Sequence, residues 1–166
     1  MLSGCGRPSA HVRGIGVSVP GSVDPIRGAM VNSIVLPSWD GVVLAPLFLR
    51  DLDVPVLVDK DVNVMGIAEQ RGPLRGVRGL LMVKASTGIG VGIVSGGALQ
   101  RGSLSAAGEL GHIPICDGTG VLCRCGQTDC LEAVAGGWGH RQGAAVTRPR
   151  RAPRTRRRRH RPERRP

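Results

Sequence analysis

Short runs of β-branched and other apolar residues mark the strands that this sequence predicts. The first run, 14–19 (GIGVSV), stops at a Pro-Gly pair, and the second, 54–59 (VPVLVD), ends on an aspartate. A third run, 79–85 (GLLMVKA), precedes a glycine-rich segment. Runs of this length between glycine, proline and polar residues are typical of buried strands. We therefore expect three strands, and a loop after the first strand that carries Asp24.

Apolar residues recur with helical spacing directly after the second of these strands. In the segment 61–71 (DVNVMGIAEQR) they stand at positions 62, 64, 65, 67 and 68. This spacing suits a helix, and Asp61 in the first turn suits the positive end of the helix dipole. The sequence therefore predicts a helix that begins where the strand 54–59 ends.

The segment 86–102 (STGIGVGIVSGGALQRG) alternates glycine with apolar residues and superficially matches a dinucleotide-binding loop. Such a loop has to open a helix whose terminus receives the pyrophosphate. Here VGIV is followed by Ser-Gly-Gly and then ALQ, which predicts a strand, a tight turn and a second strand. Two interpretations of the glycines at 88–92 stay open: a backbone concavity that binds phosphate, or residues that only permit tight turns.

Positive charge is concentrated at one end of the chain. The 166 residues carry a formal net charge of +11, and the segment 141–166 alone holds twelve arginines and one glutamate, so the remaining residues are neutral overall. Blocks of like charge with few apolar residues cannot offset the entropy lost on ordering. We therefore expect a neutral globular body, long enough to bury a core, and a disordered basic tail.

Three interpretations of this tail stay open. It could bind nucleic acid electrostatically, although it has no aromatic residues to stack on bases. It could also be a solvated cationic extension. The interpretation we favour is a shift of the reading frame in GC-rich DNA, because the patterned sequence gives way abruptly to an Arg/Pro/Ala/Gly mixture.

The apolar runs also bear on the cellular location. None approaches the roughly 18 residues of a membrane span, and the first residues lack the apolar stretch of a signal peptide. We therefore expect a soluble, cytoplasmic protein without a membrane partner. In the reducing cytosol, clustered cysteines more often bind metal or act in redox chemistry than form structural disulfides.

One histidine and four of the five cysteines lie in the segment 111–130 (GHIPICDGTGVLCRCGQTDC). Four of these side chains follow the order H-x10-C-x-C-x4-C. Three thiolates and one imidazole complete a tetrahedral zinc site with no open position, which is typical of a structural metal. A glycine after the second thiol lets the backbone turn back towards the same ion. The predicted zinc ligands are His112, Cys123, Cys125 and Cys130.

Other interpretations of this cluster stay open. The cysteines could be buried free thiols, or a redox pair, which we rank lowest because Cys-x-Cys forms a strained disulfide. Cys116 lies in an IPIC run that predicts a packed strand residue, and we treat Cys5 as incidental. Glu109 and Glu132 flank the cluster, so a bound metal would fix the backbone near both. They could accept hydrogen bonds from ligand hydroxyls, or they could be solvated surface charges.

Taken together, several segments resemble one family, the ROK family (repressor, open reading frame, kinase). They keep the family's order and a similar spacing over residues 12–138. The matching segments are GIGVSVPGSVD (14–24), LPSWDG (36–41), VDKDVNVMGIAE (58–69), STGIGVGIVSGGALQRG (86–102), AAGELGHI (106–113) and CRCGQTDCLEAVAGG (123–137).

The resemblance implies an α/β fold of the actin-like ATPase (ribonuclease H-like) class, whose two lobes close over a sugar and, in the kinases, ATP with Mg. The family's first phosphate loop should precede residue 12, and long helices should follow CLEAVA, but we find no counterpart of either. We therefore expect an incomplete fold with parts of both lobes. Its predicted regions are a remnant of the N-terminal lobe (1–75), the start of the C-terminal lobe with the zinc motif (76–140), and the tail (141–166).

The resemblance also implies roles for individual residues. The aspartate that matches Asp61 is the general base that takes the proton from the sugar hydroxyl in the kinases. The family's zinc ligands match the four predicted above, so the histidine would serve both metal and sugar. The implied sugar-binding residues are Lys60, Asp61, Glu109, His112 and Glu132, and the implied phosphate-binding residues are Ser86, Thr87, Gly88 and Gly90.

Three departures from the family pattern bear on activity. Lys60 stands where the kinases have asparagine, and a lysine can only donate hydrogen bonds. Its positive charge beside Asp61 should also make that carboxylate a poorer proton acceptor. Ser86 replaces a glycine that is usual in the phosphate loop, and Gln127-Thr128-Asp129 replaces an Asn, a variable residue and Gly.

The family divides into sugar kinases and transcriptional regulators that carry a helix-turn-helix before a sugar-sensing body. The DVNVMGIAE, VKASTGIG and SGGALQRG segments are more similar to the regulators, and Lys60 agrees with sensing without chemistry. We therefore expect a fragment of a sugar-responsive regulator, which would contact DNA only through a preceding helix-turn-helix. The alternative is a glucokinase-like, ATP-dependent sugar kinase, inactive as this fragment. Homodimers are common in the family and are an expectation here.

Overall fold

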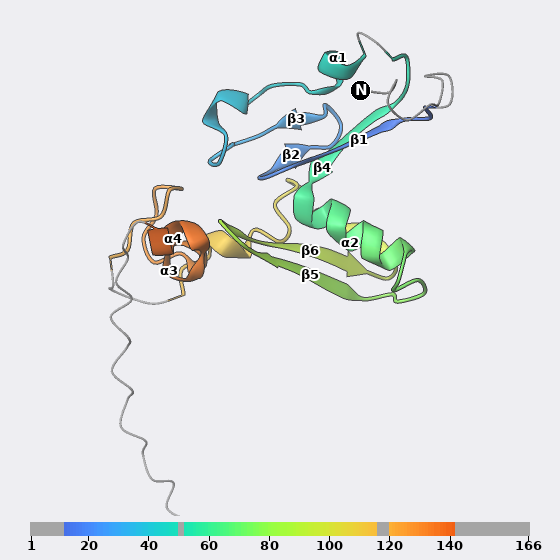
Figure 1. Ribbon diagram of the computed structural model, residues 1–166. Helices are drawn as coiled ribbons and strands as arrows, with labels where there is room; N and C mark the ends of the chain where they lie inside the picture. Colours follow the sequence, from blue (N-terminus) through green and yellow to red (C-terminus); the bar gives the residue numbers. More distant parts are fainter. Residues whose placement is uncertain (1–11, 50–51, 116–119, 142–166) are drawn as a thin grey trace, which may run out of the picture.

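A computed structural model describes residues 12–49, 52–115 and 120–141 of the chain (Figure 1). The strands are β1 (Ile15–Val19), β2 (Val23–Asp24), β3 (Ala29–Met30), β4 (Val56–Lys60), β5 (Leu80–Ala85), β6 (Ile89–Ser95) and β7 (Ala98–Gln100). The helices are α1 (Ala45–Phe48), α2 (Asp61–Arg71), α3 (Leu131–Ala135) and α4 (Gly137–Arg141), with the 3-10 helices η3 (Pro37–Trp39) and η4 (Leu110–His112). The predictions for Cys5, Cys116 and the tail beyond Arg141 lie outside the described residues.

Two of the predicted strands, β1 and β4, lie side by side and parallel. Their register places Ile15 opposite Val56 and Val19 opposite Lys60, so both strands end at the same edge. A short antiparallel pair, β2 and β3, covers this layer. The core between these elements consists of Val19, Val23, Met30, Leu44 and Val58. Because the carboxyl ends of parallel strands are where α/β folds bind ligands, this edge is where a site is expected.

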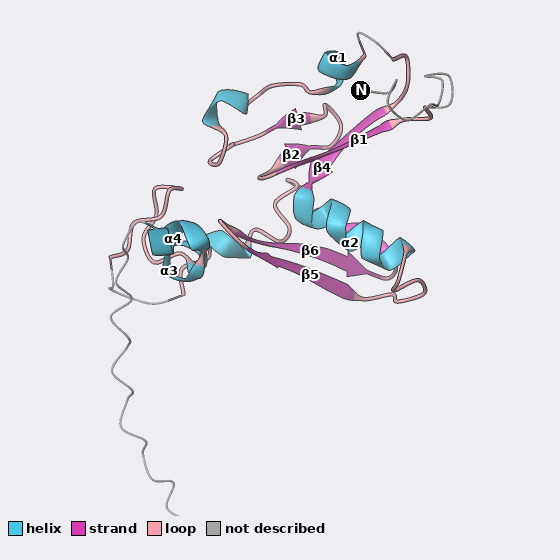
Figure 2. Ribbon diagram, in the orientation of Figure 1, coloured by secondary structure: helices cyan, strands magenta, loops and turns pink. Residues whose placement is uncertain are grey.

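Helix α2 begins and ends at the predicted residues and lies between the β1–β4 pair and the β5–β6 hairpin (Figure 2). Its buried residues are Val62, Asn63 and Gly66, whereas Val64 and Met65 are about two-fifths exposed. Small residues explain why this face of α2, and not the face with Val64 and Met65, is buried. A Cβ at Gly66 would lie 3.5 Å from Met82 Cβ, and one at Gly92 on β6 would overlap the carbonyl oxygen of Val62. Glycine therefore allows α2 to approach the hairpin closely.

The strands β5, β6 and β7 form an antiparallel sheet in chain order. The turn between β6 and β7 has two glycines with positive φ, Gly96 at 63° and Gly97 at 83°. This confirms the predicted sequence of strand, tight turn and strand. A dinucleotide-binding loop is excluded because the glycine-rich segment leads into β6 and not into a helix.

The described residues thus form the predicted α/β structure, with strands at the three predicted runs and in the predicted hairpin, and with the predicted helix. The strand expected at the IPIC run is not formed over its described residues 113–115, where Pro114 makes only an isolated bridge to Cys130. The division of the chain at residues 75 and 76 stays a prediction. Among the described residues, no helix is long and apolar enough to cross a membrane.

Candidate functional site

A pocket of about 110 Å³ opens at the edge where β1 and β4 end. The loop before β6 and the segment around η4 form its other walls. Of the predicted sugar and phosphate ligands, every one except Ser86 lines it. The lining residues are Pro20, Gly21, Val35, Lys60, Asp61, Val62, Lys84, Thr87, Gly88, Ile89, Gly90, Gly108, Glu109, His112, Arg124 and Glu132.

Asp61 lies at the first turn of α2 and faces this pocket. Its Oδ1 accepts a hydrogen bond from the Val62 N–H at 2.7 Å, and its Oδ2 pairs with Lys84 Nζ. The sequence analysis did not single out Lys84. A signal for it was present, because side chains alternate between the two faces of a strand. Lys84 on β5 therefore shares a face with Leu80 and Met82, which is the less exposed face.

Lys60 is 3% exposed, and its ammonium does not contact Asp61. Lys60 Nζ donates to the Ala107 carbonyl at 2.7 Å and to Glu109 Oε1 at 3.1 Å. Ser22 Oγ donates to the same Glu109 oxygen at 3.2 Å. The expectation that Lys60 places its charge directly beside Asp61 is therefore corrected: Lys84 supplies the cation at Asp61, and Lys60 ties β4 to Glu109.

Asp59 does not line the pocket, but its hydrogen bonds stabilise the junction between β4 and α2. Its Oδ1 accepts hydrogen bonds from the Asn63 side chain at 2.7 Å and the Lys60 N–H at 2.8 Å. Its Oδ2 pairs with Arg101, from Nη2 at 2.7 Å and from Nε at 3.0 Å. These contacts fix the backbone from which both Lys60 and Asp61 project, and no pattern along the chain indicated Arg101 as the partner of Asp59.

Glu132 lies in the first turn of α3 and is 4% exposed. Its Oε1 accepts from Arg124, at 2.8 Å from Nε and 2.7 Å from Nη2, and its Oε2 accepts from the Ile89 N–H at 2.9 Å. The interpretation of Glu132 as a solvated surface charge is therefore wrong. Glu109, with a side chain 33% exposed and paired to Lys60, is not fully solvated either.

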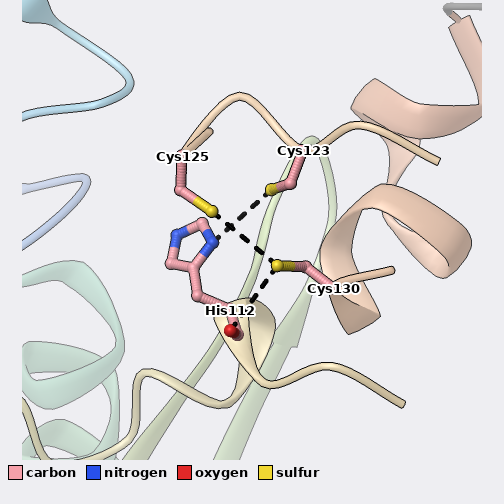
Figure 3. Close-up of side chains that lie close together, drawn as sticks. All are labelled: His112, Cys123, Cys125 and Cys130. Carbon is pink, nitrogen blue, oxygen red and sulfur yellow. Dashed lines mark hydrogen bonds between the residues drawn. The ribbon is translucent and has the colours of Figure 1, made fainter. Parts of the chain in front are cut away.

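Four side chains form a cluster beside this pocket (Figure 3). The ligand atoms of His112, Cys123, Cys125 and Cys130 all lie within 4.8 Å of one another. His112 Nδ1 is 3.6 Å from Cys123 Sγ, and Cys125 Sγ is 3.7 Å from Cys130 Sγ. Zinc–sulfur bonds of about 2.3 Å and zinc–nitrogen bonds of about 2.0 Å in a tetrahedron put ligand atoms about 3.5–3.8 Å apart. The residues therefore fit a tetrahedral metal, and the cysteines are free thiols, not disulfides.

Local backbone geometry brings the cluster together. Gly126 has a φ of 90°, and its N–H bonds to the Cys123 carbonyl at 2.9 Å, while the Cys123 N–H bonds to Gln127 O at 2.7 Å. This tight turn folds the chain back as predicted from the glycine. Cys130 immediately precedes α3, and His112 ends η4.

Without a cation, two of the three thiols of this cluster, Cys123 and Cys130, resist ionisation. Burial, a hydrogen bond with Cys125 and the charge of Cys123 raise the pKa of Cys130 to about 12. Burial also raises the pKa of Cys123. Burial acts to raise the pKa of Cys125 as well, but hydrogen bonds from the Gln127 backbone and the neighbouring thiols outweigh it and lower that pKa. A divalent metal would supply the positive charge that three adjacent thiolates require.

The predicted phosphate loop packs directly on Glu132. A Cβ at Gly88 would overlap Glu132 Oε2, and φ at Gly88 is not positive, so glycine is required here for close approach and not for a turn. Backbone groups of the loop also bond to the segment at α4: Ser86 O accepts from the Gly137 N–H at 2.8 Å, and Thr87 O from the Trp138 N–H at 2.9 Å. Ser86 thus anchors the loop and does not line the pocket.

Comparisons with known proteins agree on one family. A model of the ROK family matches residues 5–155. A glucokinase of Halalkalibacterium halodurans is 33% identical over 139 residues, which is 83% of this chain and 42% of the relative. A putative xylose repressor of Caldicellulosiruptor sp. is 36% identical over 125 residues, 75% of this chain and 31% of the repressor.

The structural comparison gives the same result. A ROK family glucokinase from Streptomyces griseus, solved in complex with glucose and AMPPNP, superposes with a TM-score of 0.67 at 28% identity, covering 81% of this chain and 45% of that one. The chain thus spans less than half the length of each of these relatives. The described residues have the α/β architecture of the actin-like ATPase class, as predicted, and cover part of it. The family match over most of the sequence, together with this fold, shows that the chain belongs to the ROK family.

Proposed function

We propose that this chain supplies the sugar-binding body of a sugar-responsive transcriptional regulator. The observation that carries the proposal is the gathering of three carboxylates, Asp61, Glu109 and Glu132, around one pocket together with His112. Carboxylates accept hydrogen bonds from hydroxyl groups, and an imidazole that binds a metal through one nitrogen can donate from the other to a hydroxyl oxygen. A sugar offers several hydroxyls at close spacing. The ligand class is therefore a sugar.

The ion pairs around the pocket favour sugar binding without phosphoryl transfer. A general base has to be free to take a proton from the sugar hydroxyl. Asp61, however, pairs through Oδ2 with Lys84, and its Oδ1 accepts from the Val62 N–H. Lys60, which replaces the asparagine of the kinases, is committed to Glu109 and Ala107. Such a pocket can hold a sugar without activating a hydroxyl.

The proposal includes a structural zinc ion held by His112, Cys123, Cys125 and Cys130. The ion would supply the charge that stabilises the thiolates and would fix the turn between the cysteines. A reducing, cytoplasmic location keeps the thiols available for metal. DNA contact would require a helix-turn-helix in addition to the described residues, and a homodimer remains part of the proposal.

A sugar kinase is the second candidate. It is favoured by the position of Asp61 at the carboxyl end of β4, beside a loop predicted to bind phosphate, and by the similarity to two glucokinases. In this case Asp61 would accept the proton of the attacking hydroxyl, and ATP with Mg would supply the phosphoryl group and neutralise its charge.

One experiment separates the two functions. The purified chain is given ATP, Mg and a panel of hexoses and N-acetylhexosamines, while sugar binding is measured by calorimetry. We expect binding without turnover, and about ten- to a hundredfold weaker binding in Glu109→Gln, because a hydrogen bond to a charged group is lost. Asp53→Asn, at an exposed aspartate outside the pocket, serves as the matched control. A phosphorylated sugar that disappears with Asp61→Asn would establish the kinase instead, and absence of any sugar binding would contradict both.

A further inference from the structure

Arg124 occupies a position that the sugar and metal roles leave unexplained. It lies between two predicted metal ligands, Cys123 and Cys125, yet its side chain is only 15% exposed and points to the pocket. Its guanidinium carbon lies 5.6 Å from the centre of the Trp138 ring, within the range of a cation–π contact. We call the segment 123–130, which carries the three cysteines of the cluster, the metal loop. The Arg124 backbone is part of this loop, and the Arg124 guanidinium contacts Trp138, so the residue is held at both ends.

The guanidinium holds Glu132 by two nitrogen atoms on one oxygen, at 2.8 and 2.7 Å. The other oxygen of Glu132 accepts the Ile89 N–H at 2.9 Å, where the predicted phosphate loop enters β6. Two links in series therefore connect Arg124 to Ile89: the paired hydrogen bonds from Arg124 to Glu132, and the hydrogen bond from the Ile89 N–H to Glu132. Each joins groups that are well shielded from water, so each is stronger than a surface ion pair.

The close packing around this series leaves little room for rearrangement. The Gly88 position faces both Glu132 Oε2 and Arg124 Nη2, and a Cβ there would overlap the carboxylate. A Cβ at Gly111 would overlap the Ile89 carbonyl and approach Glu132 Oε2. Because no cavity separates these groups, a displacement of Arg124 also displaces the loop at 86–90.

We propose that Arg124 is a positioning residue that couples metal binding to the order of the loop at 86–90, through Glu132 and the Ile89 amide. A bound metal fixes Cys123 and Cys125 and hence the backbone of Arg124. Arg124 then holds the Glu132 carboxylate within hydrogen-bond distance of the Ile89 N–H, which orders the side of the pocket formed by residues 87–90. The inference rests on the proposed metal site, but it does not depend on sugar binding.

Hydrogen exchange at the Ile89 amide reports this coupling directly. Heteronuclear NMR on the full chain is carried out with zinc bound and after EDTA treatment, with zinc content measured for each sample. In the unmodified protein we expect chelation to speed Ile89 exchange by about ten- to a hundredfold, the range for loss of a hydrogen bond to a charged group. In zinc-loaded Arg124→Gln, exchange should already be fast, and chelation should add little.

Two further variants complete the test. Arg124→Lys keeps the charge without the planar fork and should give intermediate protection with zinc retained, which also covers a failure of the glutamine variant to fold. Arg101→Gln removes another arginine that pairs with a carboxylate, Asp59, away from the metal loop, and should leave Ile89 unchanged. Wild-type protection at Ile89 in both zinc-loaded Arg124 variants, or a chain that binds no zinc, would overturn the proposal. Sugar takes no part in these measurements, so their failure is distinct from failure of the sugar-binding function.

Discussion

Two lysines show how much the surroundings of a residue decide its role. Lys60 is almost fully buried, and its ammonium joins β4 to Glu109 and to the Ala107 carbonyl. Lys84 pairs with Asp61 at the mouth of the pocket, where the two side chains are 34% and 24% exposed. Sequence position alone suggested that Lys60, next to Asp61, would act on it. The strand-to-helix junction instead sends neighbouring side chains to different partners.

This difference predicts unequal effects on stability. Lys60→Met should lower the free energy of unfolding by about 2 kcal/mol, because Glu109 and the Ala107 carbonyl lose a donor in a poorly hydrated place. Lys84→Met should cost at most about 1 kcal/mol, because water reaches both partners of that pair. Urea denaturation measures both values. Equal losses in the two variants would contradict the assigned burial of Lys60.

Among the elements, the metal loop is the one whose metal-binding side chains could be predicted most directly from the sequence. The order of its histidine and three cysteines predicted the cluster, whose ligand atoms lie within 4.8 Å of one another, and the tight turn at Gly126 folds the chain back between the cysteines. The loop also carries Arg124, whose partner Glu132 belongs to α3. That pairing was not visible in the spacing, because it depends on how the helix packs against the loop.

A single thiol substitution tests this element. The unmodified protein should hold about one zinc ion per chain, whereas Cys125→Ser should lose most of it, because a hydroxyl is a poor substitute for a thiolate ligand. Inductively coupled plasma mass spectrometry gives the content after gel filtration. Cys116→Ser is the matched control from the same stretch of sequence and should keep its zinc. A control variant that lost metal as fully as Cys125→Ser would redefine the ligand set.

In the whole molecule, one face of the β5–β6 sheet is covered and the other exposes apolar side chains. One face packs against α2, while Leu81 and Val83 on β5 are 66% and 59% exposed. Adjacent apolar side chains on a sheet favour association between chains. We therefore expect the isolated chain to self-associate at high concentration through this sheet face.

The double substitution Leu81→Lys and Val83→Lys should weaken that association about tenfold or more, since two large apolar side chains no longer leave water together. Sedimentation velocity over a range of concentrations follows the effect. Leu104→Lys changes an isolated leucine that is 85% exposed and should leave the association as it was. An unchanged association in the double variant would show that another surface is responsible.

Elements that depend on neighbours along the chain could be predicted before the structure was known. Hydrophobic runs placed β1, β4 and β5, helical spacing and an acidic first turn placed α2, and the order of histidine and cysteines placed the metal cluster. These features follow from local backbone preferences and short loops. The burial of Asn63 and Gly66 in place of Val64 and Met65 did not follow, because the face of α2 is chosen by the close approach of β6.

The partners of the charged residues, in contrast, depend on how distant segments pack together. The pairs Lys60–Glu109, Lys84–Asp61 and Arg124–Glu132 join residues 49, 23 and 8 positions apart along the chain. Ion pairs carry no periodic signal, since any cation satisfies any carboxylate that folding brings within reach. Which carboxylate stays free to meet a ligand is thus set by packing, whereas the presence of carboxylates at the site was already readable from the sequence.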